Sequence, residues 1–103
     1  MTYAFTYDAP GTPEMYRLVS EQLGPEPPDG LLAQVVTRTE AGLRHLNVWE
    51  SQEQWETYRD TRVRKAITVV LEQRGIPAPR QAPVEHLLDL VDVIAGRATA
   101  PAC

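Results

Sequence analysis

Three side chains that could take part in chemistry lie two residues apart in the segment 43–49. His45 can exchange a proton near neutral pH, Asn47 offers an amide donor and acceptor, and Trp49 offers an aromatic surface. In a strand, the period of two places these side chains and Leu43 on one face. Apolar walls with a few placed polar groups are typical of a small-molecule pocket. We therefore predict His45 and Asn47 as catalytic residues and Trp49 as a substrate-binding residue.

Other substrate-binding candidates come from the two ends of the chain. Tyr3 and Tyr7 lie on one face of an expected first strand and could add an aromatic wall, and His86, the second histidine, lies in the expected last strand. Each candidate also has a structural interpretation. The histidines and tyrosines could be ordinary strand residues, Asn47 could hold an edge by hydrogen bonds, and Trp49 could pack under the following helix.

The sequence favours no other site chemistry. His45 and His86 are far apart and lack the spacing of a metal site, so we expect no metal and no cofactor. No serine lies in a GxSxG motif, and the glycines do not form a phosphate-binding loop. Cys103, the last residue and the lone cysteine, excludes an internal disulfide.

The composition predicts one small domain. The chain has 103 residues, 43% of them apolar, and a net charge of −4. Acidic residues interrupt its densest basic stretch, so we expect no nucleic-acid partner. It has neither an apolar run long enough for a membrane span nor the basic start of a signal peptide, and we expect a cytoplasmic protein without a membrane partner.

The first half of the sequence predicts a strand, a helix and a hairpin. Residues 2–8 alternate as a strand, Thr12 and Pro13 have the form of a helix start, and Gly24 with Pro25 ends that helix. Residues 31–37 and 43–49 are the predicted hairpin strands around the loop 40–42. On the second strand, residues 31, 33 and 35 are expected on one face and residues 32 and 36 on the other.

The second half predicts a long helix and a last strand. Ser51 and Gln54 form a capping-box pattern, and the helix should end at Gly75 after a bend or break near Asp60 and Thr61. Residues 84–94 are predicted as a strand of about eleven residues, and residues 96–103 as a flexible tail.

The order β-α-β-β-α-β predicts an α+β, ferredoxin-like domain over residues 1–95. In this plan the helices cover one sheet face, but here apolar residues occur on both faces. Packing against a second copy would bury the uncovered face, so we predict a homodimer in the form of a dimeric α+β barrel.

The run Leu46-Asn47-Val48-Trp49-Glu50-Ser51-Gln52-Glu53-Gln54-Trp55, with this element order, resembles the antibiotic biosynthesis monooxygenase-like family, and in particular its small uncharacterised actinobacterial members. The resemblance covers roughly residues 2–94 and implies the dimeric barrel. Characterised members oxidise quinol-like aromatics without metal or flavin, degrade haem, or isomerise sugars and lactones. Asn47 stands where the family often has an acidic residue, and the second helix lacks the histidine of many members, which argues against haem degradation.

Two functional hypotheses follow. The first is a cofactor-independent monooxygenase-like or related tailoring enzyme that acts on a small aromatic or quinol-like molecule, with His45 as the base and Asn47 orienting an oxygen. The second is a non-catalytic small-molecule-binding or assembly protein of the same fold. The sequence names neither a substrate nor a pathway.

Overall fold

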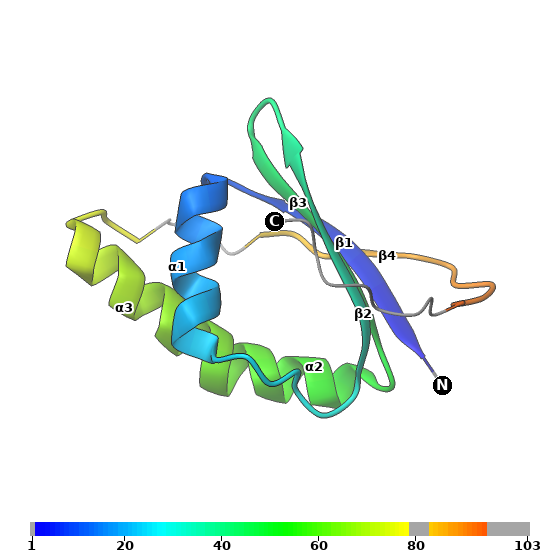
Figure 1. Ribbon diagram of the computed structural model, residues 1–103. Coiled ribbons are helices and arrows are strands. Elements are labelled where there is room, and N and C mark those ends of the chain that lie inside the picture. Colours follow the sequence, from blue (N-terminus) through cyan, green and yellow to red (C-terminus); the bar gives the residue numbers. More distant parts are fainter. Residues whose placement is uncertain (1, 79–82, 95–103) are drawn as a thin grey trace.

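The computed structural model describes residues 2–78 and 83–94, which form an α+β domain with its helices on one side of a four-stranded antiparallel sheet (Figure 1). The predicted α+β class is therefore confirmed. The strands are β1 (Tyr3–Ala9), β2 (Leu31–Thr39), β3 (Gly42–Trp49) and β4 (His86–Leu87), in the sheet order β2-β3-β1-β4. The predicted tail, residues 96–103, lies outside the described residues.

Local sequence signals set the helix ends. In α1 (Pro13–Leu23), the Thr12 side chain accepts a hydrogen bond from the Met15 backbone N–H, as an N-cap does. The Ser51 hydroxyl caps α2 (Gln52–Tyr58) in the same way by accepting from the Gln54 N–H. Both predicted helix starts are confirmed.

The second helical region continues through a π-helical segment, η1 (Arg59–Val63), into α3 (Arg64–Arg74). The irregularity expected near Asp60 and Thr61 is thus confirmed as a widened turn. Gly75, in the left-handed conformation, ends the helix at the predicted residue.

The hairpin between β2 and β3 contains an irregularity that the sequence pattern did not predict. Leu31 pairs with Trp49 but Ala33 pairs with Val48, so one extra residue is inserted at Leu32. Such a bulge reverses the alternation beyond it. Leu31 therefore packs with the core beneath the helices, and the expectation that it shares a face with Ala33 and Val35 is wrong.

The last strand is much shorter than predicted. Only His86 and Leu87 are in strand conformation, paired with Thr6 and Phe5, and the Leu88 N–H donates to the Ala4 carbonyl. The apolar pattern of this segment does not pack on the sheet, since Val84, Val91 and Ile94 are exposed, and the eleven-residue strand expected over 84–94 is wrong.

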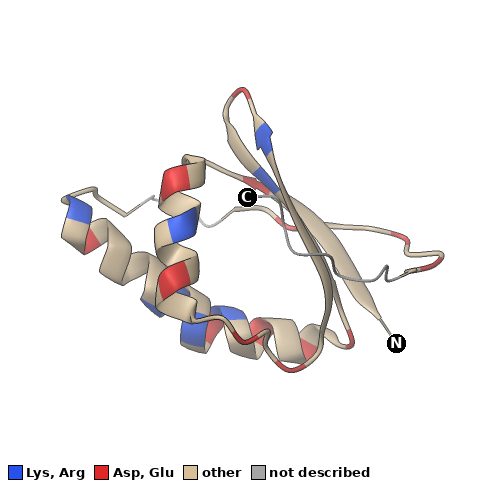
Figure 2. Cartoon of the chain, in the orientation of Figure 1, with Lys and Arg blue, Asp and Glu red and all other residues tan. Residues whose placement is uncertain are grey.

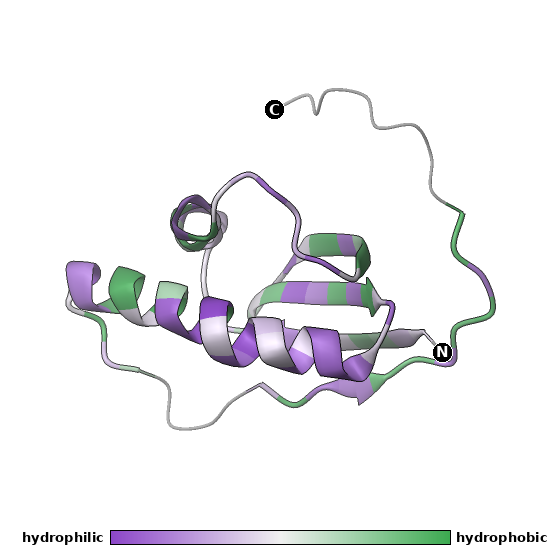
Figure 3. Cartoon of the chain, turned by 90° about the horizontal axis from the view of Figure 1, so that it is seen from below, coloured by the Kyte–Doolittle hydropathy of each residue, from purple (hydrophilic) through white to green (hydrophobic). Residues whose placement is uncertain are grey.

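Apolar side chains occur on the sheet face that carries no helix. Val35 and Leu46 face each other across β2 and β3, and both are exposed, as is Leu88 beside β1. The extended segment that follows β4 also has apolar positions without cover, visible in green in Figure 3. Charged positions gather mainly on the helices and at the turns, as Figure 2 shows. The domain therefore leaves apolar side chains exposed on the uncovered face of the sheet and along the segment that follows β4.

Gly42 offers a test of this fold at the start of β3. It has a φ of 153°, and an added Cβ would lie 2.4 Å from the Ala9 carbonyl oxygen. We predict that Gly42→Ala lowers the free energy of unfolding by about 2 kcal/mol, measured by urea denaturation. Gly11, with a φ of 139° and no atom near its added Cβ, is the matched control. Equal losses in Gly42→Ala and Gly11→Ala would contradict the proposed close contact.

Candidate functional site

The three residues singled out on β3 all lie on the sheet face beneath the helices. The exposed fractions of His45, Asn47 and Trp49 are 9%, 2% and 1%. The pairing of β3 with β1 sets His45 opposite Tyr7, Asn47 opposite Phe5, and Trp49 opposite Tyr3. The structure therefore brings together five of the six predicted site residues on two adjacent strands.

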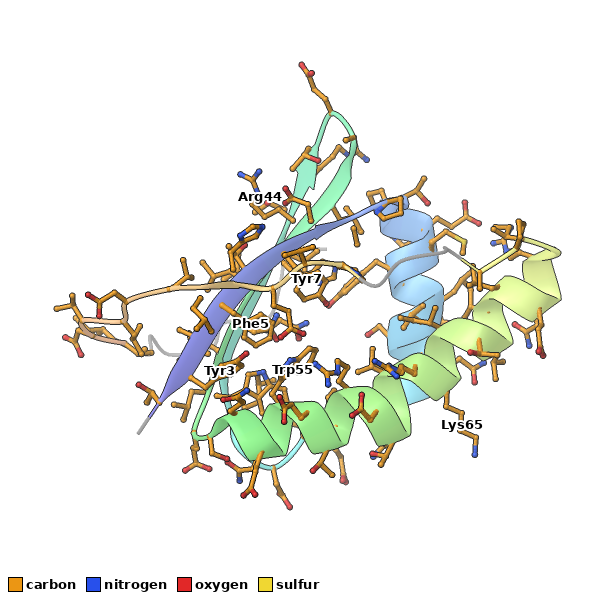
Figure 4. The ribbon with its side chains drawn as sticks, turned by 180° about the vertical axis from the view of Figure 1, so that it is seen from behind. Tyr3, Phe5, Tyr7, Arg44, Trp55 and Lys65 are labelled. Atoms are coloured by element: carbon orange, nitrogen blue, oxygen red, sulfur yellow. The ribbon has the colours of Figure 1, made fainter. Side chains whose placement is uncertain are left out.

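Aromatic rings surround these residues. All seven aromatic side chains of the sequence take part in ring contacts within this one layer, and they are Tyr3, Phe5, Tyr7, Tyr16, Trp49, Trp55 and Tyr58. The labelled rings of Tyr3, Phe5, Tyr7 and Trp55 lie between the sheet and the second helical region, whereas Arg44 points away from it (Figure 4). The site is thus an aromatic layer into which β3 projects two polar side chains.

The orientation of the Asn47 amide follows from its neighbour. The Trp49 indole N–H can only donate, and it donates to the Asn47 Oδ1 at 3.3 Å. This contact directs the Asn47 Nδ2 group away from the indole. Nδ2 is buried and has no hydrogen-bond partner among the described residues. Because buried polar groups in folded proteins almost always have partners, Asn47 presents an amide donor for which a bound oxygen atom is a suitable partner.

The imidazole of His45 is fixed by stacking. Its ring lies 4.6 Å from the Tyr7 ring at an angle of 6°, and the Tyr16 ring lies 5.8 Å away on the α1 side. Its Nδ1 atom is buried without a partner among the described residues. Burial lowers the pKa of His45 below the ordinary value of 6.5, because the charged form loses hydration. At neutral pH the ring is therefore uncharged and able to accept a proton.

The tyrosines beside these groups stay protonated. Burial raises the pKa of Tyr7, and the nearby Glu85 carboxylate and Tyr16 raise it further. Burial also raises the pKa of Tyr16. These phenols can stack on a ligand or donate a hydrogen bond to it, but His45 is the better proton acceptor.

Glu85 is a central residue that the sequence did not single out. Its carboxylate accepts hydrogen bonds from the Trp55 indole at 3.0 Å, the Arg59 guanidinium at 3.2 Å and the Tyr3 hydroxyl at 3.3 Å. Arg59 begins the π-helical segment, so this contact joins the widened turn to the residue just before β4. A single glutamate outside any motif gave no signal in the sequence.

His86 is the predicted site residue that the structure separates from the others. It is exposed and pairs with Thr6, whose side chain alternates with those of Phe5 and Tyr7. Since successive strand residues point to opposite faces, His86 lies on the sheet face away from the helices. It therefore cannot share a pocket with His45 within one chain.

Two open depressions on the surface of the described residues are lined by neither His45, Asn47 nor Trp49. The first, of about 280 Å³, lies between α1 and the β2–β3 hairpin, and its lining includes Tyr16 and Leu43. Because Tyr16 contacts the His45 ring, this depression adjoins the buried polar residues. The arrangement is a buried polar pair of which His45 adjoins a small opening.

Comparison of the sequence with protein-family models and with curated proteins gave no match. The described residues contain no group of three or more His, Cys, Asp or Glu side chains placed to hold a metal ion. None of the helices in the described part of the chain is long and apolar enough to cross a membrane.

The buried imidazole predicts a specific dependence of stability on pH. Since the folded state lowers the pKa of His45, the unfolded chain binds this proton more readily when the pH falls below about 6.5. We expect the thermal midpoint to fall between pH 7 and pH 5, and His45→Gln to reduce the slope. His86→Gln, which changes an exposed histidine, should keep the wild-type slope. Equal slopes in wild type and His45→Gln would contradict the buried neutral imidazole.

Proposed function

We propose that this chain binds a small phenolic or quinol-like aromatic and acts on it as a cofactor-independent monooxygenase-like tailoring enzyme. The observation that carries the proposal is the pair of buried atoms without partners, His45 Nδ1 and Asn47 Nδ2, within a layer of aromatic rings. An aromatic ligand with an oxygen substituent would give both atoms a hydrogen-bond partner. Its ring would stack on the tyrosines, and its hydroxyl would face the imidazole and the amide.

The residues have distinct roles in this proposal. The neutral imidazole of His45 takes the phenolic proton, and Asn47 donates a hydrogen bond to the phenolate oxygen that forms. Tyr7 holds the imidazole plane by stacking, and Trp49 holds the amide of Asn47 by its indole N–H. Deprotonation makes the ring electron-rich enough to react with dioxygen. A phenol and dioxygen then give a quinone and water, so the ring supplies the electrons and no external reductant is needed.

The proposed assembly is the dimeric α+β barrel, in which the ferredoxin-like domain packs against a second copy. The support is the apolar sheet face at Val35, Leu46 and Leu88, since exposed patches of this kind mark interaction surfaces. Two-fold pairing of the sheets would bury this face and place the helices and the two sites on the outside of the paired sheets. His86, on the same face, would then lie at the dimer seam.

A non-catalytic binding protein is the second candidate, and one observation favours it. Glu85, whose carboxylate contacts the aromatic layer, is held by three donors, and Asn47 stands where the resemblance would place an acidic residue on β3. His45 is thus the one titratable base beside the unpartnered amide among the described residues. Such a site could hold a phenol without oxidising it.

We predict that 4-nitrophenol, whose ionised form absorbs visible light, binds with its ionisation shifted to lower pH. The shift arises because the imidazolium and the Asn47 amide stabilise the phenolate, and absorbance titration measures it. His45→Gln should abolish the shift, and Asn47→Ala should weaken binding about tenfold, as expected for a lost hydrogen bond to a charged group. His86→Gln is the control and should behave as wild type. Binding that is unaffected by His45→Gln would contradict the proposed site.

Dioxygen uptake with 1,4-dihydroxynaphthalene then separates the two candidates. Uptake above the uncatalysed rate that disappears in His45→Gln supports the enzyme. Phenol binding without such uptake favours the binding protein.

We predict that light scattering gives a mass twice that of the 11.5 kDa chain at micromolar concentration. Val35→Glu should shift this mass toward the monomer, because it would bury a charge between the sheets. Ile67→Glu is the matched control, since Ile67 is similarly apolar and partly exposed but lies on α3. A monomer mass for the wild type, or equal effects of both variants, would contradict the proposed barrel.

A further inference from the structure

The depression between α1 and the β2–β3 hairpin is small, and its lining is chemically mixed. Its lining is Pro13, Tyr16, Val36, Thr37, Arg38 and Leu43. Its volume of about 280 Å³ is just below the range of roughly 300–1,000 Å³ that is usual for ligand pockets. A ligand with a single ring fits this size better than a fused polycyclic one. The lining combines apolar and aromatic side chains with the charged Arg38, so the depression offers both an apolar surface and a cation.

The depression exists because α1 packs mainly on α3 rather than on the sheet. Helix α1 has no buried residue, and the Tyr16 ring, 5.8 Å from the His45 ring, bridges from it to β3. Val36 is the direct partner of His45 across the sheet, and Leu43 lies two residues before His45 on the same face. Three lining residues are therefore immediate neighbours of the proposed base.

Arg38 lines this depression without an ion pair among the described residues. It pairs with Leu43 in the sheet and so points to the helix-covered side, and it also borders a second depression at the start of α1. Two carboxylates near these elements are engaged elsewhere. Glu14 on α1 pairs with Arg74, and Asp8 pairs with Arg44 on the other sheet face. Glu40, at the hairpin turn, borders the second depression but forms no ion pair with Arg38.

We propose that the ligand of this site is an aromatic acid, whose carboxylate binds Arg38 at the opening while its hydroxyl meets His45. This inference rests on the proposed phenol site and names its substrate class. Leu43, the partner of Arg38, and His45 are separated by about 7 Å along β3, which is comparable to the length of a benzene ring with para substituents. A guanidinium is suited to binding a carboxylate through two parallel hydrogen bonds.

The test compares 4-hydroxybenzoate with the neutral, nearly isosteric 4-hydroxybenzamide by tryptophan fluorescence and calorimetry on the full chain. We expect the acid to bind about fivefold to tenfold more tightly, with an affinity that falls as sodium chloride is added. Arg38→Gln should remove this preference and the salt dependence while leaving the affinity for the amide unchanged. Arg38→Lys should restore part of the preference.

Lys65→Gln is the matched control, since it removes the same charge from an exposed α3 side chain that points away from the site (Figure 4). It should leave both affinities as in wild type. Equal affinities for acid and amide, both sensitive to His45→Gln, would overturn the role of Arg38 and leave the phenol site standing. If neither ligand bound in a way that depends on His45, the phenol site itself would fail, and the inference with it.

Discussion

The pairing of β1 with β3 is the constraint on which the rest of this structure depends. Its register sets Tyr7, Phe5 and Tyr3 opposite His45, Asn47 and Trp49, so both strands contribute alternate residues to one layer. A slip of one residue would turn the whole set toward the opposite face. The stacking of His45 on Tyr7 follows from this register, whereas the hydrogen bond from Trp49 to Asn47 joins two residues of β3 itself.

The helices complete the layer through a second, smaller network. Trp55 contacts both Phe5 and Trp49, and its indole N–H also donates to Glu85. Arg59, at the start of the widened turn, reaches the same carboxylate. A π-helical turn shifts the direction of side chains relative to a regular α-helix, and such turns are frequent at functional sites. This network fixes the approach of the helix to the sheet, while α1 remains further away.

The sequence predicted most elements and the set of residues that share one face of β3 because those features depend on local patterns. Alternation identified β3 and its polar face, and the caps at Thr12 and Ser51 gave the helix starts. The predictions that were wrong concern features that depend on pairing between strands distant in the sequence. The bulge at Leu32 changed which residues share a face, and β4 pairs with β1 through two residues only, in a register that places His86 on the other face. Glu85 acts through three partners distant in the sequence, so no local pattern marked it.

The polar character of the β3 face is hard to explain by stability alone. Leu43 and Trp49 show that this face accepts large apolar side chains, and an apolar residue in place of Asn47 would avoid burying an amide donor without a partner. The neutral imidazole of His45 similarly gives up hydration without gaining a partner for Nδ1. Departures from the most stable choice concentrate at functional sites, where a ligand can supply the missing interactions. Both departures occur on one strand face, two residues apart, and His45 adjoins the opening at α1 through Tyr16. This favours a binding role for the face over a purely structural one.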